Sequence, residues 1–316
     1  MSLPTRRLGL EGPEVSLLGL GCNSMGLVPD DEARRIVHAA IEGGITLFDT
    51  AEVYAGGRSE ETLGRYLPAD RQGLTVITKL GHPSSVQPGL APCAEAQVVR
   101  AIEGSLRRLK CERLDVVLLH FPDPLTPFAE TVSALGRLIA EGKLAHWGVS
   151  NFTAAQLGDL VVAADGLGVP RPVVVQDEFS LIRRSAASST LPAAVSYSMG
   201  FVPFFPLAGG LLAGRYDLDA SAAAPIREQA VRRFRERFLN AATLRKVRRL
   251  REVCLRAEAP MTRVALAWLA RHAAVSSIIA GASSASQVRS NISDLAAPVA
   301  DALLEAAERA TSELSE

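Results

Sequence analysis

Short apolar runs alternate with longer segments of helical periodicity along most of the chain. Within each run the apolar residues are consecutive, which is typical of a strand buried on both faces of a parallel sheet. Eight runs are predicted to be strands of this kind: residues 17–21, 45–48, 74–78, 114–119, 144–149, 172–176, 201–205 and 277–280.

The segments between these runs have the spacing of amphipathic helices. In residues 98–109, for example, Val98, Ile102, Leu106 and Leu109 share one helical face. Repeated strand-and-helix units build a closed barrel better than an open sheet, because helices cover the outside and layers of side chains fill the inside. The pattern therefore predicts an α/β protein with a (β/α)8 TIM barrel.

We expect residues 1–316 to form a single barrel domain, because no linker separates two cores. Residues 1–16, with Gly9 and Gly12 at turn positions, predict an N-terminal β-hairpin across the barrel floor. Residues 206–240 are expected to form a long loop after the seventh strand.

Four polar residues follow consecutive predicted strands. Asp49 comes after the second strand, Lys79 after the third and His120 after the fourth, and Tyr54 lies in the second strand-to-helix loop. Taken separately, a loop tyrosine, a capping aspartate and a core histidine are ordinary. However, lysine is rarely buried without a partner, and the C-terminal ends of barrel strands meet at one mouth. The pattern therefore predicts a general acid/base site.

The composition narrows the class of partner. Hydrophobic residues make up 48% and charged residues 22% of the chain, which favours a large core over disorder. Lys plus Arg and Asp plus Glu number 34 each, so nucleic acid and anionic membranes are not expected partners. The basic stretch 232–237 is interpreted as a solvent-exposed helix face, with Phe234 and Phe238 packed inward.

The four cysteines lie far apart and show no metal-binding spacing. This argues against a structural zinc site and indicates free thiols in a reducing compartment. There is no signal-peptide pattern and no apolar run of about 18 residues. We therefore expect a cytoplasmic protein without bound metal.

The segment GGITLFDTAEVYAGGRSEETLG at residues 43–64 resembles the signature segment of the aldo-keto reductase superfamily. The similarity covers nearly the whole chain. It continues through VITKL at 76–80, LLHFPDP at 118–124, EGKLAHWGVSNF at 141–152, VVQDEFS at 174–180, PLAGGLLAGRY at 206–216 and IIAGASSASQVRSNI at 278–292. This resemblance implies the same barrel and the reduction of an aldehyde or ketone to an alcohol by hydride transfer, usually from NADPH.

The resemblance also implies a catalytic tetrad of Asp49, Tyr54, Lys79 and His120. Tyr54 would protonate the carbonyl oxygen, and His120 would orient it. A free phenol has a pKa near 10, which suits proton donation at neutral pH poorly. Because a nearby cation favours the phenolate, Lys79, held by Asp49, is expected to lower the pKa of Tyr54.

The expected cofactor contacts follow the same resemblance. Ser150, Asn151 and Gln176 suit the nicotinamide carboxamide, and an aromatic ring after the seventh strand suits stacking. Glycines after that strand allow a pyrophosphate close to the backbone, and the helix after the eighth strand offers free N–H groups. The complete expected set is Asn23, Ser150, Asn151, Gln176, Phe204, Pro206, Leu207, Gly209, Gly210, Leu211, Gly214, Arg227, Gly281, Ser283, Gln287 and Asn291.

Several alternatives stay open. NADPH is expected, but Gly281 stands where many NADPH-binding relatives have Lys or Arg, so NADH use stays open, and Arg227 is the candidate for the 2′-phosphate. The family also includes cofactor-binding regulatory β subunits of voltage-gated potassium channels. A third reading is an aldose or alcohol dehydrogenase, since the tetrad works in both directions. Phe121 and Phe205 are candidates for the pocket wall or for packing, as are Met25 and Phe179. Neither the substrate nor the oligomeric state follows from the sequence.

Overall fold

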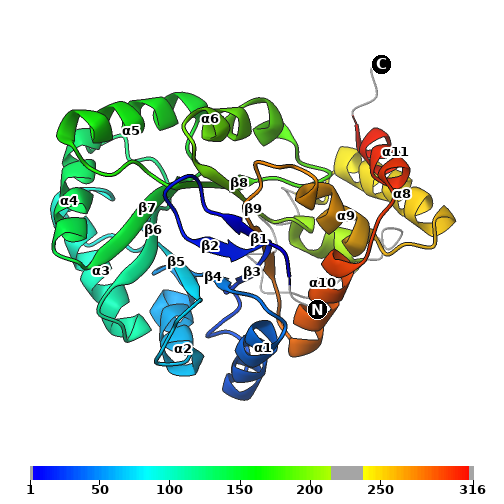
Figure 1. The fold of residues 1–316 in the computed structure, drawn as a ribbon, viewed down its shortest axis with the longest axis horizontal. Helices are drawn as coiled ribbons and strands as arrows, with labels where there is room; N and C mark the ends of the chain where they lie inside the picture. The colour runs from blue at the N-terminus through cyan, green and yellow to red at the C-terminus, as the bar shows by residue number, and fades with distance from the viewer. Residues whose placement is uncertain (1–2, 215–237, 313–316) are drawn as a thin grey trace.

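The computed structural model describes residues 3–214 and 238–312. Its eight-stranded sheet is parallel throughout, and helices surround it (Figure 1). In spatial order the strands are β10 (Ile278–Gly281), β3 (Leu18–Gly21), β4 (Leu47–Asp49), β5 (Thr75–Leu80), β6 (Leu114–Leu119), β7 (Leu144–Ser150), β8 (Val174–Glu178) and β9 (Gly200–Phe204). The predicted (β/α)8 barrel is confirmed.

Backbone contacts between the two outer strands close the ring. Phe201 of β9 forms a parallel bridge with Val275, which precedes β10. The Phe201 N–H donates to Ala274 O at 3.1 Å, and the Ser276 N–H donates to Phe201 O at 2.8 Å. The strand ends consequently meet around one mouth, as a barrel requires.

The helices lie outside the strands. They are α1 (Asp30–Glu42), α2 (Arg58–Tyr66), α3 (Glu95–Leu109), α4 (Phe128–Ala140), α5 (Ala154–Leu167), α6 (Thr190–Ser196), α8 (Ala241–Arg256), α9 (Met261–Ala270), α10 (Ala285–Ala296) and α11 (Asp301–Thr311), with short 3-10 helices η1 (Tyr54–Gly57), η2 (Ser185–Ser188) and η3 (Ala208–Ala213). Among the described residues, no helix has the length and apolar character needed to cross a bilayer.

Most element boundaries fall close to the predicted ones, and one shift has a clear cause. The second strand was expected at 45–48 but spans Leu47–Asp49. The Ile45 N–H donates to Ala40 O at 2.9 Å and so completes the end of α1 instead of pairing in the sheet. The predicted loop 206–240 contains η3, and its residues 215–237 lie outside the described part of the chain. Phe238 is buried, as expected.

The predicted N-terminal hairpin is present as β1 (Thr5–Arg7) and β2 (Glu14–Ser16), which pair antiparallel. In Figure 1 this hairpin crosses the strand ring. The Arg6 guanidinium donates to the carbonyl oxygens of Ala270, His272 and Val275 at 2.6–2.9 Å. Leu8 joins a buried cluster with inward-facing strand residues. The hairpin therefore closes the barrel floor and leaves the opposite end, at the C-termini of the strands, open.

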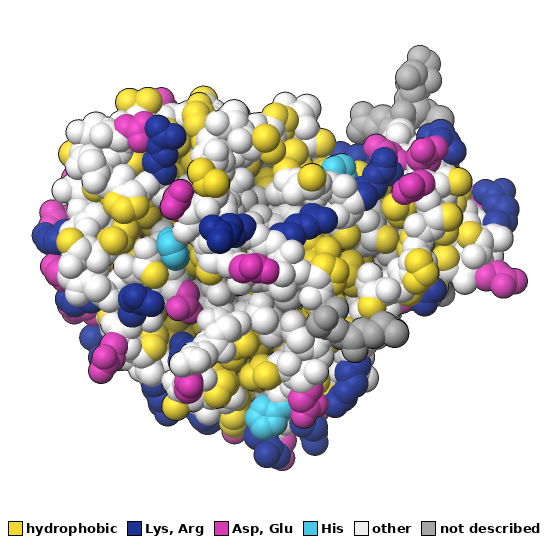
Figure 2. Space-filling view, in the orientation of Figure 1, with side chains coloured by type: hydrophobic (Ala, Val, Ile, Leu, Met, Phe, Trp, Pro, Cys, Tyr) yellow, Lys and Arg dark blue, Asp and Glu magenta, His cyan; other side chains and the backbone are white. Residues whose placement is uncertain are grey.

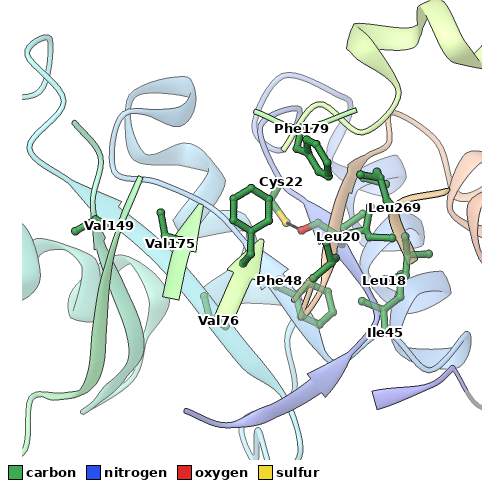
Figure 3. Packing of buried hydrophobic residues seen from close by; sticks show 14 of the residues in the cluster. Leu18, Leu20, Cys22, Ile45, Phe48, Val76, Val149, Val175, Phe179 and Leu269 are labelled. Carbon is green, nitrogen blue, oxygen red and sulfur yellow. Dashed lines mark hydrogen bonds between the residues drawn. The ribbon is translucent and has the colours of Figure 1, made fainter. Parts of the chain in front are cut away.

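The larger hydrophobic cluster combines residues of the strands with residues of the helices. Leu20, Phe48 and Val76 of neighbouring strands belong to it together with Leu269 of α9, all nearly inaccessible to solvent (Figure 3). On the face shown in Figure 2, acidic and basic side chains are intermixed, in keeping with the balanced charge. The core therefore fixes the strands whose ends carry the candidate site.

Candidate active site

The four residues of the predicted tetrad come together at the barrel mouth. Asp49 is the last residue of β4, Lys79 lies one residue before the end of β5, and His120 directly follows β6. Tyr54 begins η1, in the loop that leaves β4. Asp49 and Lys79 thus lie within their strands, slightly earlier than expected, and the parallel pairing of β4, β5 and β6 sets them side by side.

Asp49 and Lys79 form a buried ion pair. The Lys79 Nζ lies 2.7 Å from Asp49 Oδ1, and the two side chains are 1% and 5% exposed. Lys79 also donates to Thr50 O at 2.9 Å, and Gln176 Nε2 donates to the same Asp49 oxygen at 2.8 Å. Burial lowers the pKa of Lys79. The charges and hydrogen bonds of Asp49 and Tyr54 together raise this pKa by more, so the ammonium stays charged.

The Lys79 ammonium also lies beside Tyr54, with Nζ 5.2 Å from the centroid of its ring. Burial raises the pKa of Tyr54, whereas the charge of Lys79 lowers it, and the net result is a pKa above the usual value. Lys79 thus acts in the expected direction, but burial outweighs it, so the pKa of Tyr54 is not lowered overall. The phenol is protonated at neutral pH, which is the form that donates a proton.

His120 faces the same space as Tyr54, with ring centroids 6.0 Å apart in an edge-to-face arrangement. Burial, followed by the charges of Lys79 and His82, lowers the pKa of His120 to about 2. The imidazole is therefore neutral and carries one N–H, which can donate to a carbonyl oxygen. Its buried Nδ1 atom has no hydrogen-bond partner among the described residues.

A cavity of about 460 Å³ opens at this mouth, within the usual size range of small-molecule sites. Asp49, Tyr54 and His120 line it, while Lys79 lies behind them. Most of the expected cofactor contacts line it too: Asn23, Ser150, Asn151, Gln176, Phe204, Pro206, Leu207, Gly209, Gly210, Gly281 and Ser283. One cavity therefore holds the acid/base groups and the amide, hydroxyl and aromatic side chains.

Asn151 ties the end of β7 to the tetrad. Its backbone is left-handed, with φ of 64°, a conformation that asparagine tolerates better than most residues. Its side-chain Nδ2 donates to His120 O at 2.9 Å and to Ser150 Oγ at 3.1 Å. Because the Gln176 amide is bound to Asp49, both amides are held in place by residues of the tetrad.

The backbone after β9 turns sharply where it meets the cavity. Gly209 and Gly210 have φ of 66° and 101°, and Phe205 and Ala208 are also left-handed, at 52° and 47°. Turns of this kind can direct successive N–H groups into a concave surface that suits an anion. The N–H groups of Ala208 and Gly210 already donate to Phe205 O and Leu207 O, so the pyrophosphate contact expected of η3 stays a prediction.

A model of the Aldo/keto reductase family matches residues 17–309 of the chain. The chain belongs to this family. A relative from Oryza sativa subsp. japonica is 33% identical over 302 residues, which cover 92% of this chain and 90% of that protein. One from Arabidopsis thaliana is 32% identical over 299 residues, 91% of this chain and 89% of that protein. Both relatives are named probable voltage-gated potassium channel subunit beta.

Some expected contacts of this aldo/keto reductase do not line the cavity. Leu211 is 1% exposed and belongs to the core, and Asn291 is buried in α10. Gln287 Oε1 accepts from the Ser283 N–H at 2.8 Å, so this side chain braces the turn before α10. Gly214 follows η3 beyond the cavity wall. Arg227 lies outside the described residues.

A carboxylate that the sequence analysis did not identify is hydrogen-bonded to the start of α10. The Ala285 N–H donates to Oε1 of Glu32 in α1 at 2.9 Å. This hydrogen bond is the largest cause of a lowered pKa at Glu32, so the group is ionised at neutral pH. One of the N–H groups expected to receive the cofactor's anion is therefore already bound to a negative charge of the protein.

The cavity of this aldo/keto reductase includes further residues outside the expected cofactor set: Gly21, Ser24, Phe121, Phe205, Ala213, Ile279, Ala280 and Ala282. Of the four apolar residues considered for the pocket wall, Phe121 and Phe205 line it, whereas Met25 and Phe179 are fully buried. Gly21 and residues 279–280 lie at the ends of neighbouring strands. The rule that C-terminal strand ends meet at one mouth, called the strand-end rule below, could therefore have found them as well.

Proposed function

We propose that this aldo/keto reductase reduces an aldehyde or ketone to an alcohol, with NAD(P)H as hydride donor and Tyr54 as proton donor. The observation that carries the proposal is that a protonated Tyr54 and a neutral His120 line one cavity, with the Lys79–Asp49 pair buried behind them. Family membership supports oxidoreduction of this class.

When bound, the nicotinamide cofactor would supply the hydride for the carbonyl carbon. The chain's residues fit such a group, since Ser150 and Asn151 offer polar atoms, Phe204 offers a ring, and η3 has left-handed turns. His120 donates a hydrogen bond to the carbonyl oxygen and so directs it toward Tyr54. The Tyr54 hydroxyl then transfers its proton to that oxygen, and the charge of Lys79 stabilises the resulting phenolate until solvent returns the proton.

A second candidate function is that of a cofactor-binding regulatory subunit, because both relatives carry the name of a channel β subunit. A panel of aldehydes and ketones with NADPH and with NADH separates the two. Consumption of reduced cofactor that depends on the carbonyl supports the reductase, whereas cofactor binding with no turnover of any carbonyl supports the regulatory subunit. A second panel, of alcohols and aldoses with oxidised cofactor, tests the reverse direction.

We propose NADPH as the usual cofactor, with Arg227 as a contact of the 2′-phosphate, and Glu32 as a residue that opposes this phosphate. Glu32→Gln is expected to lower the KM for NADPH by about two- to fivefold, the typical effect of one charge at a helix N-terminus, and to leave the KM for NADH unchanged. Steady-state kinetics with both cofactors checks this.

Asp31→Asn is the matched control, because Asp31 is an exposed carboxylate in the same first turn of α1. Arg227→Ala should act in the opposite direction and raise the KM for NADPH alone. Equal shifts for both cofactors in Glu32→Gln would show that Glu32 does not discriminate between them.

A further inference from the structure

No hydrogen bond between the described residues explains the orientation of the His120 ring. A histidine that acts through one ring nitrogen is usually held by a hydrogen bond to the other, which fixes both the tautomer and the direction of the ring. Here the buried Nδ1 has no partner among the described residues. Within the described part of the chain, ring packing is what holds the imidazole in its direction.

Besides Tyr54, which meets it edge to face from the cavity side, two further rings pack against the His120 ring. The Phe121 ring stacks on it almost in parallel, with centroids 5.1 Å apart and planes 9° apart. The His82 ring meets both rings edge to face, 5.3 Å from His120 at 65° and 5.5 Å from Phe121 at 69°. Edge-to-face contacts between rings are favourable and depend on angle. His82 does not line the cavity and so supports the other two rings from behind.

His82 is itself firmly held. Its Nδ1 accepts from the Ser84 N–H at 3.1 Å, which leaves the proton on Nε2. The loop around it is bound by Glu52, whose Oε1 accepts from the Gly81 N–H at 3.1 Å and from Ser85 Oγ at 2.7 Å. Glu52 lies two residues before Tyr54 and is nearly buried, so this loop is fastened to the segment that carries the proton donor.

We propose that His82 is a positioning residue. It packs edge-on against His120 and Phe121 and thereby fixes the direction in which the His120 N–H points into the cavity. The inference rests on the proposed function, because the direction matters for holding a substrate carbonyl opposite Tyr54. His82 does not line the cavity, so its effect should be confined to the carbonyl.

His82→Ala is expected to lower kcat/KM for the carbonyl by about ten- to a hundredfold, as a small displacement of a catalytic group does. The Kd for NADPH, measured by quenching of protein fluorescence, should not change. His82→Phe keeps a ring but no nitrogen, and should recover most of the activity. His38→Ala, at an exposed position of α1, is the matched control and should behave as wild type.

A second readout does not depend on turnover. Nitrogen-15 NMR of the His120 ring should show one set of signals in wild type and His82→Phe, and averaged or doubled signals in His82→Ala. Wild-type kcat/KM together with unchanged His120 signals in His82→Ala would overturn the inference. Loss of activity in His82→Phe equal to that in His82→Ala would overturn the packing role as well. If the proposed function fails, no variant turns over carbonyls, yet the NMR comparison still decides the role of His82.

Discussion

Tyr54→Phe is expected to lower kcat for carbonyl reduction by about 10²- to 10⁴-fold, the usual contribution of a general acid. The substitution removes only the hydroxyl. The ring that meets His120 edge to face at 6.0 Å, and that lies beside the Lys79 ammonium, stays in place. The Kd for NADPH should therefore remain close to that of wild type, and the loss should lie in the proton transfer.

Single-turnover kinetics with pre-bound NADPH measures this step without product release. Tyr197→Phe provides the control, because it also deletes a phenol hydroxyl but lies directly after α6, far from the mouth. The next residue, Ser198, is at the opposite end of the barrel, since its backbone oxygen accepts from the Leu10 N–H of the floor loop. A Tyr54→Phe protein that turns over like wild type would remove Tyr54 from the mechanism. A protein that loses cofactor binding as well would assign the residue a structural role instead.

The barrel could be predicted because its strands are apolar on both faces, a pattern that depends on local sequence alone. The strand-end rule then located Asp49, Lys79 and His120 correctly, because the C-terminal ends of parallel strands must share one mouth. Boundaries were less certain where backbone groups had two possible partners. The N–H of Ile45 bonds to the end of α1 and not to the sheet, which shortens β4 at its start.

Tertiary side-chain contacts could not be predicted in this way. Glu32 meets the N–H of Ala285 across a long separation in sequence, and no periodicity relates the two residues. The pKa of Tyr54 could not be predicted for a related reason. The sequence supplied the sign of the Lys79 contribution, but the opposing effect of burial depends on how the loop after β4 packs, and burial is the larger of the two.

Lys79→Met is expected both to abolish reduction and to lower the free energy of unfolding by about 3–5 kcal/mol, the usual effect of breaking a buried ion pair. The Asp49 side chain is 5% exposed, so loss of the ammonium at 2.7 Å would leave a buried carboxylate with no neutralising charge. Urea unfolding gives the stability, and turnover assays well below the transition give the activity of the folded fraction. Unchanged stability would contradict the burial of the pair.

The double variant Asp49→Asn/Lys79→Met separates stability from chemistry. Asparagine keeps an oxygen that can accept from Gln176 Nε2, at 2.8 Å in the wild-type site, but carries no charge that needs compensation. Most of the stability lost in Lys79→Met should therefore return, because replacing both partners of a buried pair is far less costly than removing one. Activity should not return, since no cation is left to stabilise the Tyr54 phenolate. Recovery of both would mean that the ion pair only supports the fold; recovery of stability alone places the charge of Lys79 in the reaction itself.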